Sequence, residues 1–203
     1  KHPERIDESY DRFFTTLTGK EELDPFIANR EVLDALNISY DDGTRLFSLY
    51  GDEGAGRKFT IRHFCADHGL ACVSVNGSKL FVYDFSFVEK TLWALCRECI
   101  LLGACCCLDN LEYREEEKDK FFGYMDLAFE KLGKHSITAF TVSRDKLPLR
   151  EMTQIEFTQL EIPTPNNQER EDVWRYYAKD YVLCNDVDLQ EMATKFLFTP
   201  GKI

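Results

Sequence analysis

Two hydrophobic periods alternate along most of the chain. From residue 44 onward, short apolar runs typical of buried strands are separated by segments in which apolar residues recur at helical spacing. Strands are predicted at 46–50, 71–75, 104–109, 137–142 and 154–162, and helices at 58–68, 87–102, 118–132, 166–179 and 187–196. Strands that alternate with helices need crossover connections, so we predict a three-layer α/β/α fold with a mostly parallel, five-stranded sheet.

The first 43 residues show only the helical period. Their apolar residues form two stripes: Tyr10, Phe13, Phe14 and Leu17, then Val32, Leu33, Leu36 and Ile38. A turn signal, Asp41-Asp42-Gly43, separates this part from the first predicted strand. We therefore predict an N-terminal helical extension over residues 1–43 and one core domain over residues 44–203.

Composition excludes several classes of protein. Hydrophobic residues make up 44% of the chain, enough for a proper core, and the formal net charge is −11. Such a charge argues against a broad phosphate-neutralising surface, so we predict no nucleic-acid partner, although one nucleotide needs only a local pocket. No apolar run approaches the roughly 20 residues that span a bilayer, and residues 1–11 contain no apolar signal region. We predict a soluble, cytoplasmic protein with no membrane partner.

Eight cysteines raise the question of a metal site or disulfides. Cys105, Cys106 and Cys107 are consecutive in an apolar strand, where neighbours point to opposite faces, and Cys96 and Cys99 lie within one predicted helix. No second cysteine pair and no histidine pair follows at zinc-site spacing. The simpler interpretation is small buried residues in a reducing compartment, and we predict no cysteine-bound metal.

A glycine-rich turn follows the first predicted strand and opens the next helix. The segment has the layout of the phosphate-binding loop G-x-x-x-x-G-K-[ST]. Glycines let the backbone wrap around phosphate oxygens, and a helix N-terminus offers unpaired N–H groups and a partial positive charge. The predicted nucleotide-binding residues are Gly51, Asp52, Glu53, Gly54, Ala55, Gly56, Arg57, Lys58 and Phe59.

The last two positions of this loop depart from the motif. Arg57 stands in the place of the lysine, and its guanidinium still pairs with phosphate. Lys58 stands in the place of a hydroxyl that binds magnesium, and an ammonium repels a cation instead of coordinating it. A shift by one residue, with Lys58 as the lysine and Thr60 as the hydroxyl, is one alternative, although both groups then come one residue late. The other alternative is a glycine-rich turn that binds no ligand.

A second candidate motif closes the predicted strand at 104–109. A buried strand that ends in Asp and Glu places one carboxylate for magnesium and a second to activate water. Asp109 fits the metal-binding role, but Asn110 occupies the water-activating position, and an amide cannot accept the proton. Glu112 lies two residues further on and is an alternative base. This motif therefore predicts a metal ligand without a regular catalytic base.

The order of these motifs resembles the core of AAA+ ATPases, most of all bacterial members of the family. In that family a polar residue closes the strand at 137–142 and senses the terminal phosphate, and Ser143 is the matching position. Residues 155–165 and 169–174 look like the family's fifth strand and the helix after it. Residues 187–203 are similar to the segment that leads into the helical lid, so the resemblance implies that the chain ends where the lid would begin.

The resemblance also implies a ligand and partners. The ligand is ATP or ADP, the ion at Asp109 is magnesium, and the full-length protein associates with its own copies or with another protein. Arg150 matches an arginine finger for a neighbouring subunit, but a solvated arginine is the simpler interpretation.

Departures at Lys58, Asn110 and Ser143 decide the predicted function. With both motifs degenerate, we predict an AAA+-like domain that binds ATP or ADP and hydrolyses it weakly or not at all, a pseudoenzyme. One alternative is an active ATPase that uses Arg57, Thr60 and Glu112. The other is a nucleotide-free scaffold that keeps the fold and binds protein partners.

Overall fold

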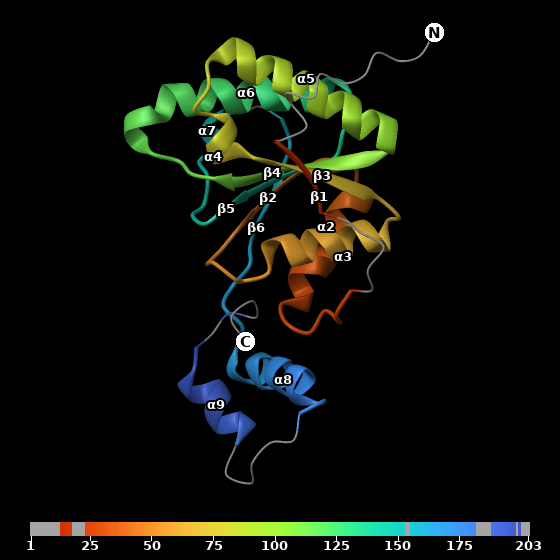
Figure 1. Cartoon of the computed structure of the whole chain (residues 1–203), viewed down its shortest axis with the longest axis vertical. Helices are drawn as coiled ribbons and strands as arrows, with labels where there is room; N and C mark the ends of the chain where they lie inside the picture. Colours follow the sequence, from red (N-terminus) through yellow and green to blue (C-terminus); the bar gives the residue numbers. More distant parts are fainter. Residues whose placement is uncertain (1–12, 18–22, 153–154, 182–187, 198, 200–203) are drawn as a thin grey trace.

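The computed structural model describes residues 13–17, 23–152, 155–181, 188–197 and 199. A six-stranded sheet in the order β1-β3-β4-β5-β2-β6 forms its centre (Figure 1). The strands are β1 (Phe14–Thr16), β2 (Leu46–Tyr50), β3 (Ala71–Asn76), β4 (Ala104–Leu111), β5 (Ala139–Ser143) and β6 (Thr158–Glu161). The described helices are α2 (Arg30–Asp41), α3 (Arg57–Asp67), α4 (Gly77–Leu80), α5 (Phe85–Leu102), the 3-10 turn η1 (Glu115–Glu117), α6 (Lys118–Lys134), α7 (Leu149–Met152), α8 (Asn167–Ala178) and α9 (Leu189–Lys195).

Strands β2 to β6 run parallel to one another, which confirms the predicted α/β alternation and the mostly parallel sheet. Helices α5 and α6 cover one face of the sheet, and α2 and α3 lie on the other (Figure 1). Each face packs its own hydrophobic cluster. The parallel direction places the ends of β2, β4 and β5 at one edge of the sheet, where the predicted loop and carboxylates also lie.

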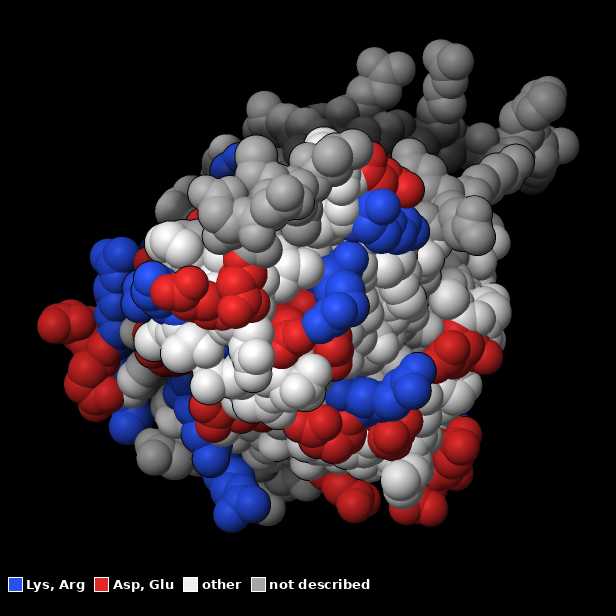
Figure 2. All heavy atoms as spheres, turned by 90° about the horizontal axis from the view of Figure 1, so that it is seen from below, with Lys and Arg blue, Asp and Glu red and all other residues white. Residues whose placement is uncertain are grey.

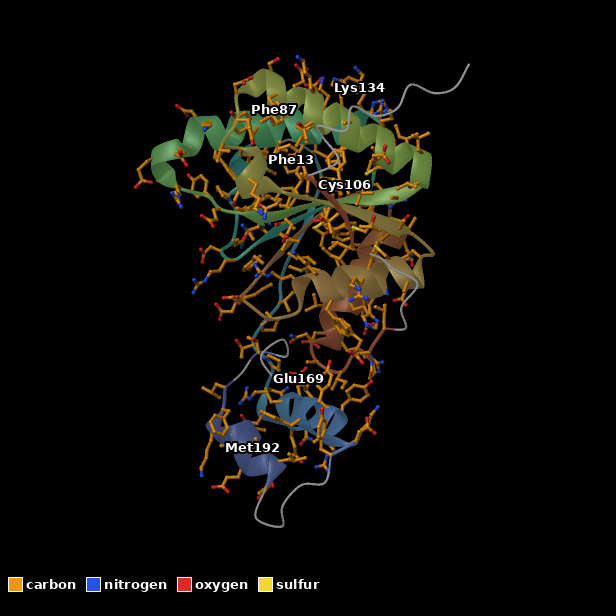
Figure 3. The ribbon with its side chains drawn as sticks, in the orientation of Figure 1. Phe13, Phe87, Cys106, Lys134, Glu169 and Met192 are labelled. Carbon is orange, nitrogen blue, oxygen red and sulfur yellow. The ribbon has the colours of Figure 1, made fainter. Side chains whose placement is uncertain are left out.

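The sheet has a sixth strand, so the prediction of five strands was wrong at one edge. Strand β1 lies within the predicted helical extension and pairs antiparallel with β3. Thr15 and Thr16 are β-branched and suit a pleated strand. Phe13 packs against Phe87 with ring centroids 5.7 Å apart, on the side of the sheet that α5 covers (Figure 3). Pairing with the open edge of β3 therefore overrides the helical spacing of residues 10–17, whereas the second apolar stripe does form helix α2.

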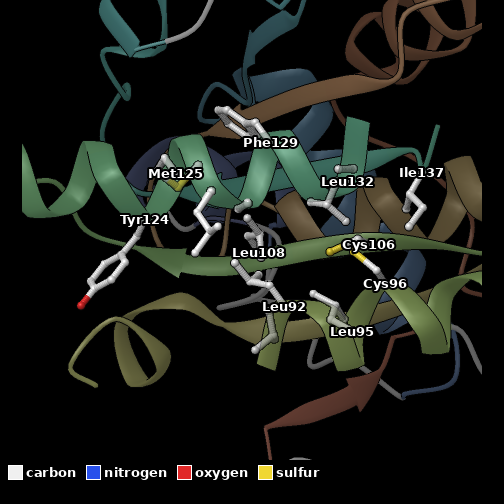
Figure 4. Packing of buried hydrophobic residues seen from close by; sticks show 14 of the residues in the cluster. Leu92, Leu95, Cys96, Cys106, Leu108, Tyr124, Met125, Phe129, Leu132 and Ile137 are labelled. Atoms are coloured by element: carbon white, nitrogen blue, oxygen red, sulfur yellow. The ribbon is translucent and has the colours of Figure 1, made fainter. Parts of the chain in front are cut away.

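Alternation along β4 sends its side chains into both clusters. Cys106 and Leu108 point toward α5 and α6, where Leu92, Met125 and neighbouring residues enclose them (Figure 4). Cys105 and Cys107 point to the opposite face, toward α3. The seven cysteines that the structure describes are all buried, in agreement with the prediction of small core residues.

Helices α8 and α9 pack on each other and lie apart from the layers of the sheet (Figure 1). A capping box between Asn166 and Glu169 starts α8. The buried Arg170 donates a hydrogen bond from Nε to the carbonyl of Ala193 at 2.9 Å and so joins the two helices. Glu169 also accepts a bond at 2.8 Å from the backbone N–H of Asn29, which connects this helical pair to the segment before α2 (Figure 3).

The surface in Figure 2 bears acidic and basic side chains side by side. The described residues drawn there form no continuous basic face, which agrees with the net charge of −11. Among the described residues, no helix combines the length and the apolar character needed to cross a membrane.

Candidate nucleotide site

The glycine-rich loop lies at the carboxyl end of β2, a central strand flanked by β5 and β6. Gly51 is in close contact with the strand beside it, since a Cβ atom at this position would be 2.4 Å from the carbonyl oxygen of Ile162. Its N–H donates to the carbonyl of Arg144 at 3.0 Å. Gly56 has a φ of 101° and caps α3, so the helix N-terminus faces the loop. This is a geometry in which loop and helix N–H groups can surround an anion.

Both cations of the loop have protein partners in this structure. The guanidinium of Arg57 donates a hydrogen bond to the carbonyl of Ser143 at the end of β5. The ammonium nitrogen of Lys58 lies 2.5 Å from Oδ2 of Asp109 at the end of β4. The Asp109 side chain is only 12% exposed and that of Lys58 is 51% exposed. The half-exposed ammonium therefore covers one side of a nearly buried carboxylate.

This ion pair decides whether magnesium fits. In phosphate-binding-loop NTPases the hydroxyl at the position of Lys58 and the strand aspartate hold the ion together. Here a positive charge already contacts Asp109, and an ammonium offers no lone pair to a metal. Burial, and then the charge of Asp109, raises the pKa of the neighbouring Cys107 thiol to about 12, so this thiol adds no negative charge. These residues do not fit a magnesium ion in its usual place.

The side chains of the other predicted catalytic residues contact partners outside the glycine-rich loop. Asn110 adopts a left-handed φ of 52° at an irregularity in the pairing of β4, and its side chain donates to Ser78 on α4 at 3.3 Å. Glu112 is exposed and pairs with Arg114 at 3.1 Å. The hydroxyl of Ser143, although buried, donates to the carbonyl of Asp145 at 2.7 Å.

A cavity of about 530 Å³, here called the loop cavity, nevertheless connects several of these residues. Glu53 and Arg57 line it from the loop, and Asn110 and Glu112 line it from the end of β4. Arg150, the residue that matched an arginine finger, lies on α7 and is exposed.

A second cavity of about 160 Å³, here called the apolar cavity, lies beside the other end of the loop. Its lining is mostly apolar and comes from the segment before α2, the start of α3, the end of β6 and helix α8: Pro25, Phe26, Ile27, Ala28, Asn29, Ala55, Gly56, Phe59, Thr60, Ile162, Val173 and Tyr177. The rings of Phe26 and Phe59 stack with their planes 4° apart and their centroids 5.6 Å apart. The sequence had pointed to four residues of this set, Ala55, Gly56 and Phe59 as nucleotide-binding residues and Thr60 as the alternative hydroxyl.

Polar contacts fix the walls of the apolar cavity. Asn29 has a φ of 57° and donates from Nδ2 to the carbonyl of Pro163 at 2.9 Å. The hydroxyl of Tyr177 donates to Asp24 at 3.3 Å, and partial burial followed by the charge of Asp24 raises its pKa. These residues come from distant parts of the chain and match no local motif, so only the tertiary structure identifies them.

The end of the chain also contacts the loop. The buried Thr199 donates from its hydroxyl to the carbonyl of Glu53 at 3.0 Å. Segments that precede and follow the sheet therefore both meet the loop, and the site is built from the whole length of the chain.

Comparisons with known proteins identify the fold. No protein-family model and no curated protein matches the sequence. Among solved structures, a katanin structure titled "Structural Basis for Katanin Self-Assembly" matches with a TM-score of 0.67 and 15% sequence identity. The match covers 96% of this chain and 72% of that chain. Katanin is an AAA+ ATPase, and this chain has the AAA+ fold.

Proposed function

We propose that this chain is an AAA+-like domain that binds ATP or ADP without magnesium and hydrolyses ATP weakly or not at all. The ion pair between Lys58 and Asp109 carries the proposal, because it puts an ammonium where the metal ion would sit. A fixed positive charge at this position neutralises Asp109 in place of the ion, so the carboxylate does not repel the phosphates. Binding is therefore retained while the chemistry that depends on the metal is lost.

The phosphates would lie in the loop. The glycine backbone and the N-terminus of α3 supply N–H groups. The guanidinium of Arg57 lines the loop cavity together with Glu53 of the loop. Arg57 now donates to the carbonyl of Ser143, a neutral acceptor. A phosphate is a stronger acceptor for a guanidinium than a carbonyl is, so we expect Arg57 to exchange this partner for the ligand.

The nucleoside would lie in the apolar cavity. That cavity adjoins the loop at Ala55 and Gly56, and its aromatic residues offer faces for a base. An apolar pocket beside an anion-binding loop is the combination that a nucleotide needs.

Hydrolysis lacks two of its usual contributions. The amide of Asn110 cannot accept a proton, and its contact with Ser78 directs it toward α4. Lys58 replaces the hydroxyl ligand of the metal ion. A missing general base alone slows turnover by about 10²–10⁴-fold.

Two alternative functions, an active ATPase and a nucleotide-free scaffold, predict different results for nucleotide binding and hydrolysis. An active ATPase would need Glu112 as the base, but Glu112 is exposed and paired with Arg114. A nucleotide-free scaffold would show no binding at all. Assembly with further copies is part of this proposal, since the solved katanin structure concerns self-assembly.

Calorimetric titration of the protein with ATP and with ADP tests the proposal. We expect both nucleotides to bind, and their affinity to change by less than about threefold, or ~0.7 kcal/mol, when magnesium is chelated. In a separate assay of ATP hydrolysis, we expect phosphate release to be at least ~10²-fold slower than in an ATPase with an intact base. Absence of heat with either nucleotide would favour the scaffold. Rapid, magnesium-dependent phosphate release would favour the active enzyme.

The apolar cavity has its own test. Replacing Phe59 by alanine removes one aromatic face, and we expect the affinity for ATP to fall by about tenfold, because a stacked base is worth ~1–3 kcal/mol. Phe85→Ala is the matched control, since Phe85 is 51% exposed on α5, across the sheet. Equal affinities of the Phe59→Ala variant and the unmodified protein would place the base elsewhere.

A further inference from the structure

Three cysteine side chains meet inside the core on the side of the sheet that faces α3. Cys65 comes from α3, Cys72 from β3 and Cys105 from β4, and we call them the thiol cluster. Their sulfur atoms all lie within 4.8 Å of one another, and those of Cys65 and Cys105 are 3.4 Å apart. Cys72 and Cys105 are register partners on adjacent parallel strands. The three residues are at most 1% exposed.

The spacing of the cluster matches a coordination site more closely than its sequence positions suggest. A metal–thiolate bond of about 2.3 Å places three sulfurs of a trigonal site roughly 4 Å apart. The 3.4 Å between the sulfurs of Cys65 and Cys105, and the upper limit of 4.8 Å for all three pairs, are compatible with that value. The sequence shows no metal motif because the ligands come from three separate elements, and only the fold brings them together.

The number and type of ligands indicate the class of metal. Within the described part of the chain, these three sulfurs are the only grouping of at least three candidate ligand atoms close enough to hold an ion. Soft thiolate ligands suit zinc, iron–sulfur clusters and Cu(I). Structural zinc and iron–sulfur clusters take four protein ligands, so a set of three thiolates favours Cu(I).

We propose that the thiol cluster binds one Cu(I) ion. Each thiol that coordinates the ion gives its proton to solvent and binds as a thiolate, and the copper stays monovalent, so protons and electrons balance. The ion would join α3, whose first turn contains Lys58, to β4, which carries Asp109. The site is closed to solvent, so uptake requires α3 to separate briefly from the sheet, and we expect slow loading.

Anaerobic titration with Cu(I), buffered by an excess of a Cu(I) chelator, tests the proposal on the whole chain. We expect one tightly held Cu(I) per chain and an X-ray absorption spectrum with sulfur ligands only. Bound metal should also raise the melting temperature, because it binds the folded state alone. The Cys65→Ser and Cys105→Ser variants should each lose at least ~10-fold in affinity for Cu(I), or ~1.4 kcal/mol.

Cys106→Ser is the matched control, because Cys106 is equally buried on β4 but points to the opposite face of the sheet. It should retain Cu(I). An equal loss in this variant, retention in both cluster variants, or a spectrum with nitrogen or oxygen ligands would overturn the proposal. So would tighter binding of zinc than of Cu(I). The spectrum of the unmodified protein decides the question even if a variant fails to fold.

Discussion

Replacement of Lys58 by threonine is expected to make nucleotide binding depend on magnesium. The substitution removes the ammonium that lies 2.5 Å from Asp109 and introduces the hydroxyl that phosphate-binding loops use as a metal ligand. Without magnesium, Asp109 then faces the phosphates uncompensated, and like charges repel. We expect the affinity of the variant for ATP to rise by at least about tenfold, or ~1.4 kcal/mol, when magnesium is added. Calorimetry with and without a chelator measures this difference.

Lys90→Thr provides the control for this experiment. Lys90 is an exposed helical lysine on α5, so its loss has the same effect on net charge and a similar effect on helix propensity. The affinity of the Lys90→Thr variant for ATP should remain independent of magnesium, like that of the unmodified protein. If Lys58→Thr also binds equally well with and without magnesium, Lys58 does not stand in for the ion.

Replacement of Gly51 by alanine is expected to destabilise the protein and to abolish nucleotide binding. The new Cβ atom would lie 2.4 Å from the backbone carbonyl oxygen of Ile162, which cannot move without disturbing the end of β6. Overpacking and backbone strain each cost ~1–3 kcal/mol, so we expect the free energy of unfolding to fall by roughly 3 kcal/mol or more. Urea denaturation measures the loss.

Gly43→Ala separates crowding from backbone conformation. Gly43 has a φ of +102° and nothing lies within 4 Å of an added Cβ atom. Only the conformational cost applies there, about 1 kcal/mol. Similar losses in the two variants would mean that the close approach to Ile162 is not what requires glycine at position 51.

The sequence predicted most of the sheet because its signals are local. Strand and helix periods, turn glycines and helix caps depend on neighbouring residues, so the five parallel strands and the long helices α3, α5 and α6 between them were found. Strand β1 was missed for the complementary reason. Its three residues pair with β3 from a distance of about sixty positions, and that pairing leaves no periodic signal in so short a segment.

The candidate site also has one part that the sequence predicts and another that only the fold reveals. The loop from Gly51 to Lys58 is contiguous, and its glycines and cations can be recognised in the sequence. The same residues also predicted that the metal chemistry had changed, since Lys58 cannot act as a metal ligand. What the ammonium does instead depends on Asp109, and their contact exists only because β2 and β4 end at the same edge of one sheet.

The chain itself therefore determined the alternation of strands and helices, the position of the glycine-rich loop and the presence of Lys58 where the motif has a hydroxyl. Only the tertiary structure decided that Lys58 neutralises Asp109, that Phe26 and Tyr177 join Phe59 around an apolar cavity, and that three separate thiols share one place in the core. The physical reason is the separation along the sequence over which each kind of interaction acts. Backbone conformation and periodicity are properties of neighbouring residues, whereas charge pairing, cavities and ligand clusters form between residues that are brought together by the packing of the whole chain.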